Sequence, residues 1–91
     1  MSILDNSTRP HLAPGCRWAG AENNSTLVYP EGALRLQPTA AAILERCDGQ
    51  RTFEQIVREL QNLYSASEPD KIRADVASLL NRLHEKRVVD F

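Results

Sequence analysis

The sequence predicts a single α+β domain, winged helix-turn-helix-like, in which a three-stranded antiparallel sheet is followed by three helices. Two observations on the pattern support this prediction: short apolar runs with strand-like alternation come first, and apolar stripes with helical spacing come later. The length and composition agree with it. A chain of 91 residues with 42% hydrophobic and 25% charged residues is typical of one globular domain built around one core.

The sequence of the N-terminal part predicts a flexible arm followed by a hairpin. Residues 1–14 contain polar residues and two prolines without periodicity, so we expect a flexible N-terminal arm ahead of a single domain over residues 15–91. A short apolar segment at residues 16–19 and an apolar run at residues 26–29 enclose turn-forming residues at 20–25. This pattern indicates two antiparallel strands.

A third strand follows the Pro30-Glu31-Gly32 break at residues 33–36. Leu34 and Leu36 fall on one face of this strand and Arg35 falls on the other, as a half-buried strand requires. Such a sheet has edges whose backbone groups need either cover or a partner.

Three apolar stripes with helical spacing occupy the remainder of the chain. Pro38 suits the first turn of the first helix, and Asp48-Gly49 ends it. Residues 52–55 form a capping-box pattern before the second helix, and residues 67–70 suit the start of the third. Residues 88–91 are too apolar for a free tail, so we expect them to pack back as a short extended segment. The stripes are Ala40, Ile43, Leu44 and Cys47; then Phe53, Ile56, Val57, Leu60, Leu63 and Tyr64; then Ile72, Val76, Leu79, Leu80 and Leu83.

Composition and motifs argue against catalysis, metal binding and membrane insertion. The net charge of -1 gives no positive excess for nucleic acid or anionic lipid. Cys16 and Cys47 form no Cys-x-x-Cys motif, and His11 and His84 have no partner in the sequence that indicates a metal site or an acid–base pair. No stretch has the length of a signal peptide core or a bilayer span. We therefore expect a cytoplasmic protein that is not an enzyme and holds no cofactor or metal.

The predicted fold leaves nucleic-acid binding and dimerisation open as alternatives. In a DNA-binding reading, the second helix would enter the groove of the duplex. Its polar positions, however, include Glu54 and Glu59 beside a single arginine, Arg58, and carboxylates oppose phosphates. Dimerisation by exchange of the N-terminal hairpin is the other alternative.

Capture of an extended peptide is the hypothesis that uses the predicted sheet edge. If residues 33–36 lie at the edge of the sheet, a peptide could add itself there as a further strand. If the third helix lies alongside, part of its apolar stripe would share a groove suited to apolar anchors with acidic neighbours. The groove would comprise Val76, Leu79, Leu80 and Leu83, flanked by Arg73 and Arg82. Periodicity alone leaves open whether this stripe only packs against the other helices.

The order and spacing of many short words over residues 16–91 resemble the PqqD family of pyrroloquinoline quinone (PQQ) biosynthesis. Gln37 departs from the Asn that the family commonly has before the helix-starting proline. The words that carry the resemblance are Pro30-Glu31, Leu34, Leu36, Pro38-Thr39-Ala40, Ile43-Leu44, Cys47-Asp48-Gly49, Thr52, Ile56-Val57, Leu60, Tyr64, Asp75-Val76, Leu79-Leu80 and Leu83.

The resemblance implies a peptide chaperone, of the kind that serves as a recognition element in ribosomal peptide modification. Such a protein binds the precursor peptide PqqA and presents it to PqqE, the radical S-adenosylmethionine enzyme that cross-links a Glu and a Tyr of the peptide. In the family the peptide adds to the third strand and lies against the third helix. The corresponding residues here are Ala33, Leu34, Arg35 and Leu36 on the strand, and Asp75, Val76, Leu79 and Leu83 on the helix.

Overall fold

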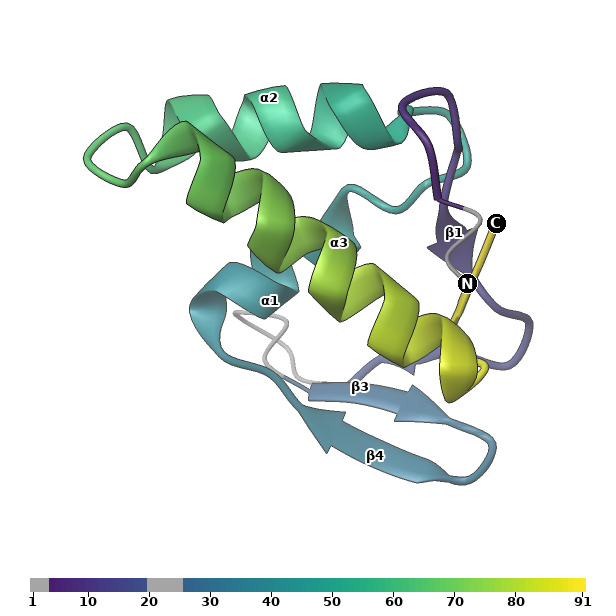
Figure 1. Cartoon of the computed structure of the whole chain (residues 1–91). Coiled ribbons are helices and arrows are strands. Elements are labelled where there is room, and N and C mark those ends of the chain that lie inside the picture. The colour runs from purple at the N-terminus through teal and green to yellow at the C-terminus, as the bar shows by residue number, and fades with distance from the viewer. Residues whose placement is uncertain (1–3, 20–25) are drawn as a thin grey trace.

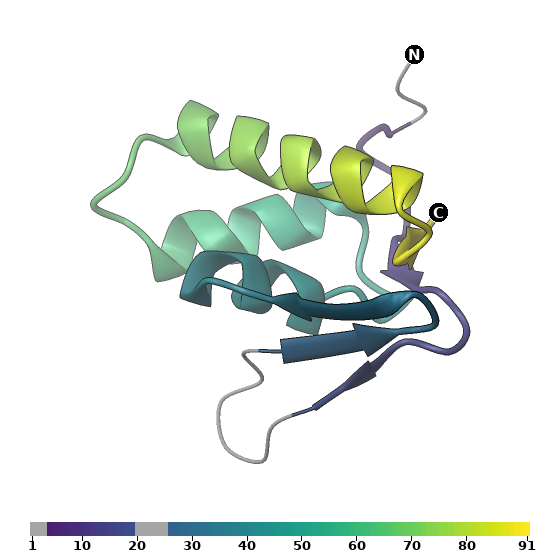
Figure 2. The same ribbon diagram turned by 90° about the horizontal axis from the view of Figure 1, so that it is seen from below.

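The computed structural model describes residues 4–19 and 26–91, and the predicted turn at residues 20–25 lies outside them. Within these residues the chain forms helices on one side of an antiparallel sheet (Figures 1 and 2). The elements in chain order are β1 (His11–Leu12), β2 (Arg17–Trp18), β3 (Thr26–Tyr29), β4 (Gly32–Arg35), α1 (Pro38–Glu45), α2 (Phe53–Leu63), α3 (Pro69–Glu85) and β5 (Val89–Asp90).

The strands described here form two antiparallel sheets, ordered β2-β3-β4 and β1-β5. The α+β class and the predicted strands at β2, β3 and β4 are therefore confirmed. The element order departs from a sheet followed by helices, because β5 comes after α3 and pairs with β1 near the N-terminus. The β3–β4 hairpin turns through Pro30 and Glu31, and Gly32 has a φ of +154°, which a residue with a side chain rarely adopts.

Local sequence signals account for the helix boundaries. α1 begins with Pro38 in its first turn, and Gly49 shortly after its end has a φ of +76°. The predicted capping box is present at α2: the Thr52 hydroxyl accepts a hydrogen bond from the Gln55 N–H at 3.2 Å. The Gln55 side chain in turn accepts one from the Thr52 N–H at 2.8 Å. α3 likewise has Pro69 in its first turn.

The core lies between the helices and β3. Each large side chain that is fully buried there stabilises the fold by about 1.5–3 kcal/mol. Val76 and Leu80 of α3 belong to this core and are 1% and 0% exposed. The other fully buried members include Leu27, Ile43, Leu44, Ile56, Val57, Leu60, Val88 and Val89.

The N-terminal residues that the structure describes differ from the expected arm. β1 pairs with β5, with His11 opposite Asp90 and Leu12 opposite Val89. Pro10 is buried, and its carbonyl accepts a hydrogen bond from the Gly49 N–H at 3.0 Å. These partners are distant in sequence, and a two-residue strand is too short to show alternation, so the sequence contained no signal for this packing. Residues 88–91, in contrast, pack back as expected.

Candidate functional site

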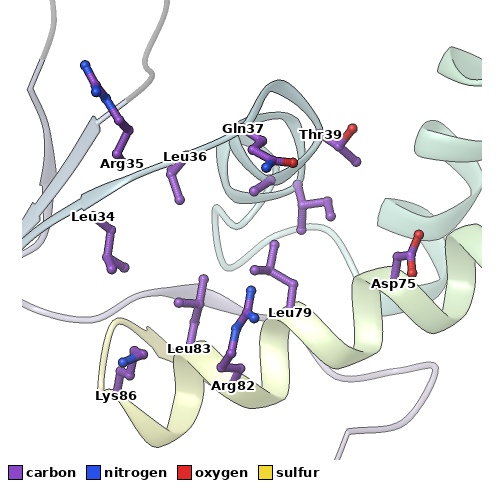
Figure 3. A pocket seen from close by; sticks show the side chains of 12 residues that line it. Leu34, Arg35, Leu36, Gln37, Thr39, Asp75, Leu79, Arg82, Leu83 and Lys86 are labelled. Atoms are coloured by element: carbon purple, nitrogen blue, oxygen red, sulfur yellow. The ribbon is translucent and has the colours of Figure 1, made fainter.

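A groove of about 630 Å³ runs between β4, the start of α1 and the C-terminal half of α3 (Figure 3). It lies between β4 and α3, the two elements that carry the predicted peptide-binding residues. The lining residues are Leu34, Arg35, Leu36, Gln37, Thr39, Ala40, Ile43, Asp75, Leu79, Arg82, Leu83 and Lys86.

Apolar side chains of β4 and α3 face each other across this β4–α3 groove. Leu34 and Leu36 are half-buried and point from the strand side toward Leu79 and Leu83 of α3 (Figure 3). Leu79 and Leu83 are only 8% and 3% exposed, so they belong to the core and to the groove at once. Ile43 of α1 adds a further buried apolar side chain. A partly buried apolar surface of this kind suits apolar side chains of a ligand.

The backbone of β4 offers hydrogen-bonding groups along the same groove. In the register of the sheet, Leu27 lies opposite Leu34 and Val28 lies opposite Ala33. The Thr26 carbonyl accepts a hydrogen bond from Ala19 at 2.9 Å, so the peptide groups of Thr26 face β2 and those of Leu27 face β4. Because this direction alternates along a strand, the N–H and C=O groups of Ala33 face away from β3, and those of Arg35 do the same. Among the described residues no strand pairs with this edge.

Charged side chains divide the groove into two ends. Arg82 and Lys86 are exposed near one end, and neither has an ion pair with the residues that the structure describes. The side chain of Arg35, also exposed and without an ion pair among these residues, points away from Leu79 and Leu83 (Figure 3). Asp75 lies at the other end, where Lys71 is 3.4 Å from its carboxylate. The first end is therefore positive and available to a carboxylate, while the second end is already neutralised.

Some predicted site residues lie elsewhere. Arg73 does not flank the groove: its guanidinium lies 5.7 Å from the centre of the Phe53 ring and donates a hydrogen bond to Asn6 at 3.1 Å. Arg73 and Arg82 are nine residues apart, which places them about half a turn from each other on a helix of 3.6 residues per turn. Val76 and Leu80 face the core and do not line the groove.

Other groove residues were missed by the sequence analysis. Gln37, Thr39, Ala40 and Ile43 come from the start of α1, and Lys86 follows α3. The sequence did contain one signal for these α1 residues: only Gln37 separates Leu36 from Pro38. Because the helix starts so soon after the strand, its first turn must lie next to that strand. The first turns of α1 therefore line part of the β4–α3 groove.

An ion-pair cluster fixes α1 against α2 and so holds one wall of the groove. Glu59 of α2 contacts Arg46 at 3.0 Å and Arg51 at 2.8 Å, and Arg51 also contacts Asp48 at 2.6 Å. The Asp48 carboxylate accepts hydrogen bonds from the backbone N–H groups of Arg51 and Gln50, which lower its pKa. The connection between the two helices is thus stabilised by charge-assisted hydrogen bonds.

The cysteine thiols and the His84 imidazole have environments typical of structural rather than catalytic side chains. Burial raises the pKa of the Cys47 thiol to about 12, and burial also raises that of Cys16, so neither is activated as a nucleophile. His84 lies with its Nδ1 atom 3.1 Å from the Val89 carbonyl and stacks on Phe91. Over residues 4–19 and 26–91, no cluster of three His, Cys, Asp or Glu side chains could hold a metal ion. No helix in this part of the chain has the length and apolarity needed to cross a bilayer.

Comparison with known proteins assigns the chain to a family. The sequence profile of coenzyme PQQ synthesis protein D (PqqD) matches residues 25–89. The PqqA binding protein of Methylococcus capsulatus is 44% identical over 82 residues, which cover 86% of this chain and 87% of that protein. The PqqA binding protein of Stutzerimonas stutzeri is 38% identical over 82 residues, covering 88% and 87%.

The fold agrees with that of a solved relative. The solution structure of the PqqD portion of Methylobacterium extorquens PqqCD has a TM-score of 0.78 and 33% sequence identity with this chain. The match covers 98% of this chain and 96% of that one. That portion is described as a functional, stand-alone recognition element for ribosomally synthesized and post-translationally modified peptides. On sequence and fold together, the chain belongs to the PqqD family.

Proposed function

We propose that this chain binds the precursor peptide PqqA by strand addition to β4, with the peptide lying along α3 in the β4–α3 groove. Its relatives are named PqqA binding proteins. The observation that carries the placement is the unpaired edge of β4, whose Ala33 and Arg35 peptide groups face away from β3, next to an apolar groove. Strand addition satisfies the backbone groups of both partners, while the groove selects side chains.

Each part of the groove has a role in this proposal. Leu34 and Leu36 on one wall and Leu79 and Leu83 on the other hold apolar side chains of the peptide. Arg82 and Lys86 at the positive end attract acidic residues of the peptide and raise the association rate, and Arg35 adds positive charge on the other face of the strand. The predicted contacts with the groove at Arg73, Val76 and Leu80 are not retained, because Arg73 faces Phe53 and the other two side chains face the core.

The role we infer for the chain in PQQ biosynthesis is that of a non-catalytic adaptor in the cytoplasm that presents bound PqqA to PqqE. Burial raises the pKa of the Cys47 and Cys16 thiols, which disfavours the thiolate that a cysteine nucleophile needs. We further infer that the fold is a winged helix-turn-helix variant, with α1 and α2 as the helix-turn-helix. The peptide-binding domain over residues 15–91 then carries residues 4–14 as an additional packed segment.

DNA binding has less support than peptide binding. On α2, the exposed Arg58 is 3.6 Å from Glu54, and Glu59 is engaged by two arginines. A duplex would therefore meet a helix whose described charges are already paired or acidic. A homodimer formed through the open edge of β4 would compete with the peptide for the same backbone groups.

Calorimetric titration with synthetic PqqA, with a scrambled peptide as control, tests the proposal. We expect saturable binding of one peptide per chain and no binding of the scrambled peptide. Amide resonances of Ala33 and Arg35 should shift on binding more than those of Trp18 on the opposite edge strand. Absence of saturable binding to a folded chain, or shifts confined to β2, would contradict it. Light scattering without peptide tests whether the chain self-associates.

A further inference from the structure

The β4–α3 groove continues past Asp75 into a second hollow. This hollow measures about 190 Å³ and lies between α1, α2 and the N-terminal half of α3. It shares Thr39, Ile43 and Asp75 with the groove, so the two form one continuous depression. Thr39 and Asp75 mark this end in Figure 3. The remaining lining residues are Leu60, Tyr64, Ser67, Lys71, Ile72 and Val76.

The side chains at the bottom of this second hollow are apolar and buried. Leu60 is 0% exposed, Val76 is 1% exposed and Ile72 is 8% exposed. The half-buried Tyr64 supplies an aromatic ring at the side. These side chains come from the packed core, so the shape of the hollow is set before any ligand arrives. An apolar group that enters it gains contact with a surface that loses little freedom on binding.

The size of the hollow selects the occupant. A volume of 190 Å³ corresponds to about six water molecules at their bulk volume of about 30 Å³ each. Pockets for drug-sized ligands start at about 300 Å³, so this one suits a single large side chain rather than a separate small molecule. Continuity with the groove means that a peptide lying along α3 can deliver such a side chain.

The charged residues at the rim of the hollow favour an uncharged occupant. Lys71 and Asp75 are the charged residues that line the hollow, and they lie 3.4 Å from each other. Both are largely exposed, so water screens the pair and it presents no net charge to the hollow. A charged side chain would lose water on entry without finding an unpaired partner, whereas an apolar one would lose nothing.

We propose that this second hollow is a specificity pocket for one large apolar side chain of the bound peptide, outside the segment that pairs with β4. The inference rests on the proposed peptide binding in the β4–α3 groove. Such a pocket adds sequence specificity, which strand addition alone cannot provide, because backbone hydrogen bonds do not distinguish one peptide sequence from another. The peptide is thereby held at two places: along the edge of β4, and at a pocket formed by helices.

Filling the pocket tests this inference. Ser67 is exposed, lines the second hollow and does not line the groove, so Ser67→Trp places a large side chain at the pocket alone. Ser65→Trp, two residues earlier at an exposed position, is the matched control. With synthetic PqqA we expect Ser67→Trp to weaken binding about tenfold or more, the value of one buried large side chain. Ser65→Trp should stay within about twofold of the unaltered chain.

Nuclear Overhauser effects in the unaltered chain decide the question without any substitution. An apolar side chain of the peptide should show contacts with the methyl groups of Ile72 and Leu60, which line the pocket and not the groove. Contacts with Leu79 and Leu83 but none with Ile72 or Leu60, together with unchanged affinity of Ser67→Trp, would overturn the pocket and leave the groove intact. A chain that does not bind the peptide would overturn both.

Discussion

Ala33→Pro separates backbone pairing from side-chain contact at the edge of β4. The Ala33 N–H points away from β3, because Ala33 lies opposite Val28, whose peptide groups face β2. Proline removes this N–H and places a ring where the backbone of an added strand would lie. The β3–β4 ladder loses no hydrogen bond, and proline is tolerated on edge strands. Ala33 is exposed, so no packed side chain is removed.

The expected effect follows from the bonds involved. One backbone hydrogen bond to the peptide contributes about 0.5–1.5 kcal/mol net, and the proline ring also prevents the close approach that the neighbouring bond at Arg35 requires. Loss of one or two such bonds raises the free energy of binding by about 0.5–3 kcal/mol, or Kd by about 2- to 150-fold. The free energy of unfolding should fall by less than about 1 kcal/mol.

Calorimetry with PqqA gives Kd, and urea denaturation gives the stability of the same preparations. Ala33→Ser is the matched control, because it keeps the N–H and remains small and exposed. We expect Ala33→Ser to bind like the unaltered chain. If a folded Ala33→Pro chain binds PqqA as tightly as Ala33→Ser does, the peptide does not pair with this edge and strand addition is wrong.

Three further predictions concern the ion-pair cluster between α1 and α2 and the burial of the cysteines. Glu59→Ala breaks the contacts with two arginines and should lower the unfolding free energy by about 1 kcal/mol in urea denaturation, whereas equal stability would mean that the cluster is fully screened. The folded chain holds the pKa of Asp48 below its usual 3.8, so its contribution to stability is present above that pH and lost as the pH falls through the folded pKa. Asp48→Asn should therefore reduce the loss of unfolding free energy that the chain shows as the pH falls. If that loss is unchanged in the variant, other carboxyl groups cause it. Iodoacetamide at pH 8 should alkylate Cys16 before Cys47, as mass spectrometry of the digested protein would show, and the reverse order would contradict the burial of Cys47.

The sequence predicted those elements whose signals are local. The Thr52 capping box, Pro38 and Pro69 at helix starts and the helical stripes each depend on residues within one or two turns, and the helices are found where these signals place them. The strand at β4 was likewise predicted, because alternation and the Pro30-Glu31-Gly32 break are local too, whereas its position at the edge of the sheet comes from the structure. What lies opposite each element is not a local property.

The misses share that physical cause. β1 pairs with β5 across nearly the whole length of the chain. Each of these strands has two residues and no sequence pattern of its own, so each forms only because the other lies beside it. Arg73 and Arg82 looked equivalent along α3, yet the rotation of the helix places one against Phe53 and the other in the groove.

The sequence alone determined which faces are apolar and where strands become helices, because hydrophobic periodicity and capping are written within each segment. Only the tertiary structure decided that Leu79 and Leu83 meet Leu34 and Leu36 in an open groove while Leu80 of the same stripe lies in the core and lines neither the groove nor the second hollow. Both outcomes bury apolar surface from the same helix. The rotation of α3, which its packing against several elements fixes together, selects between them.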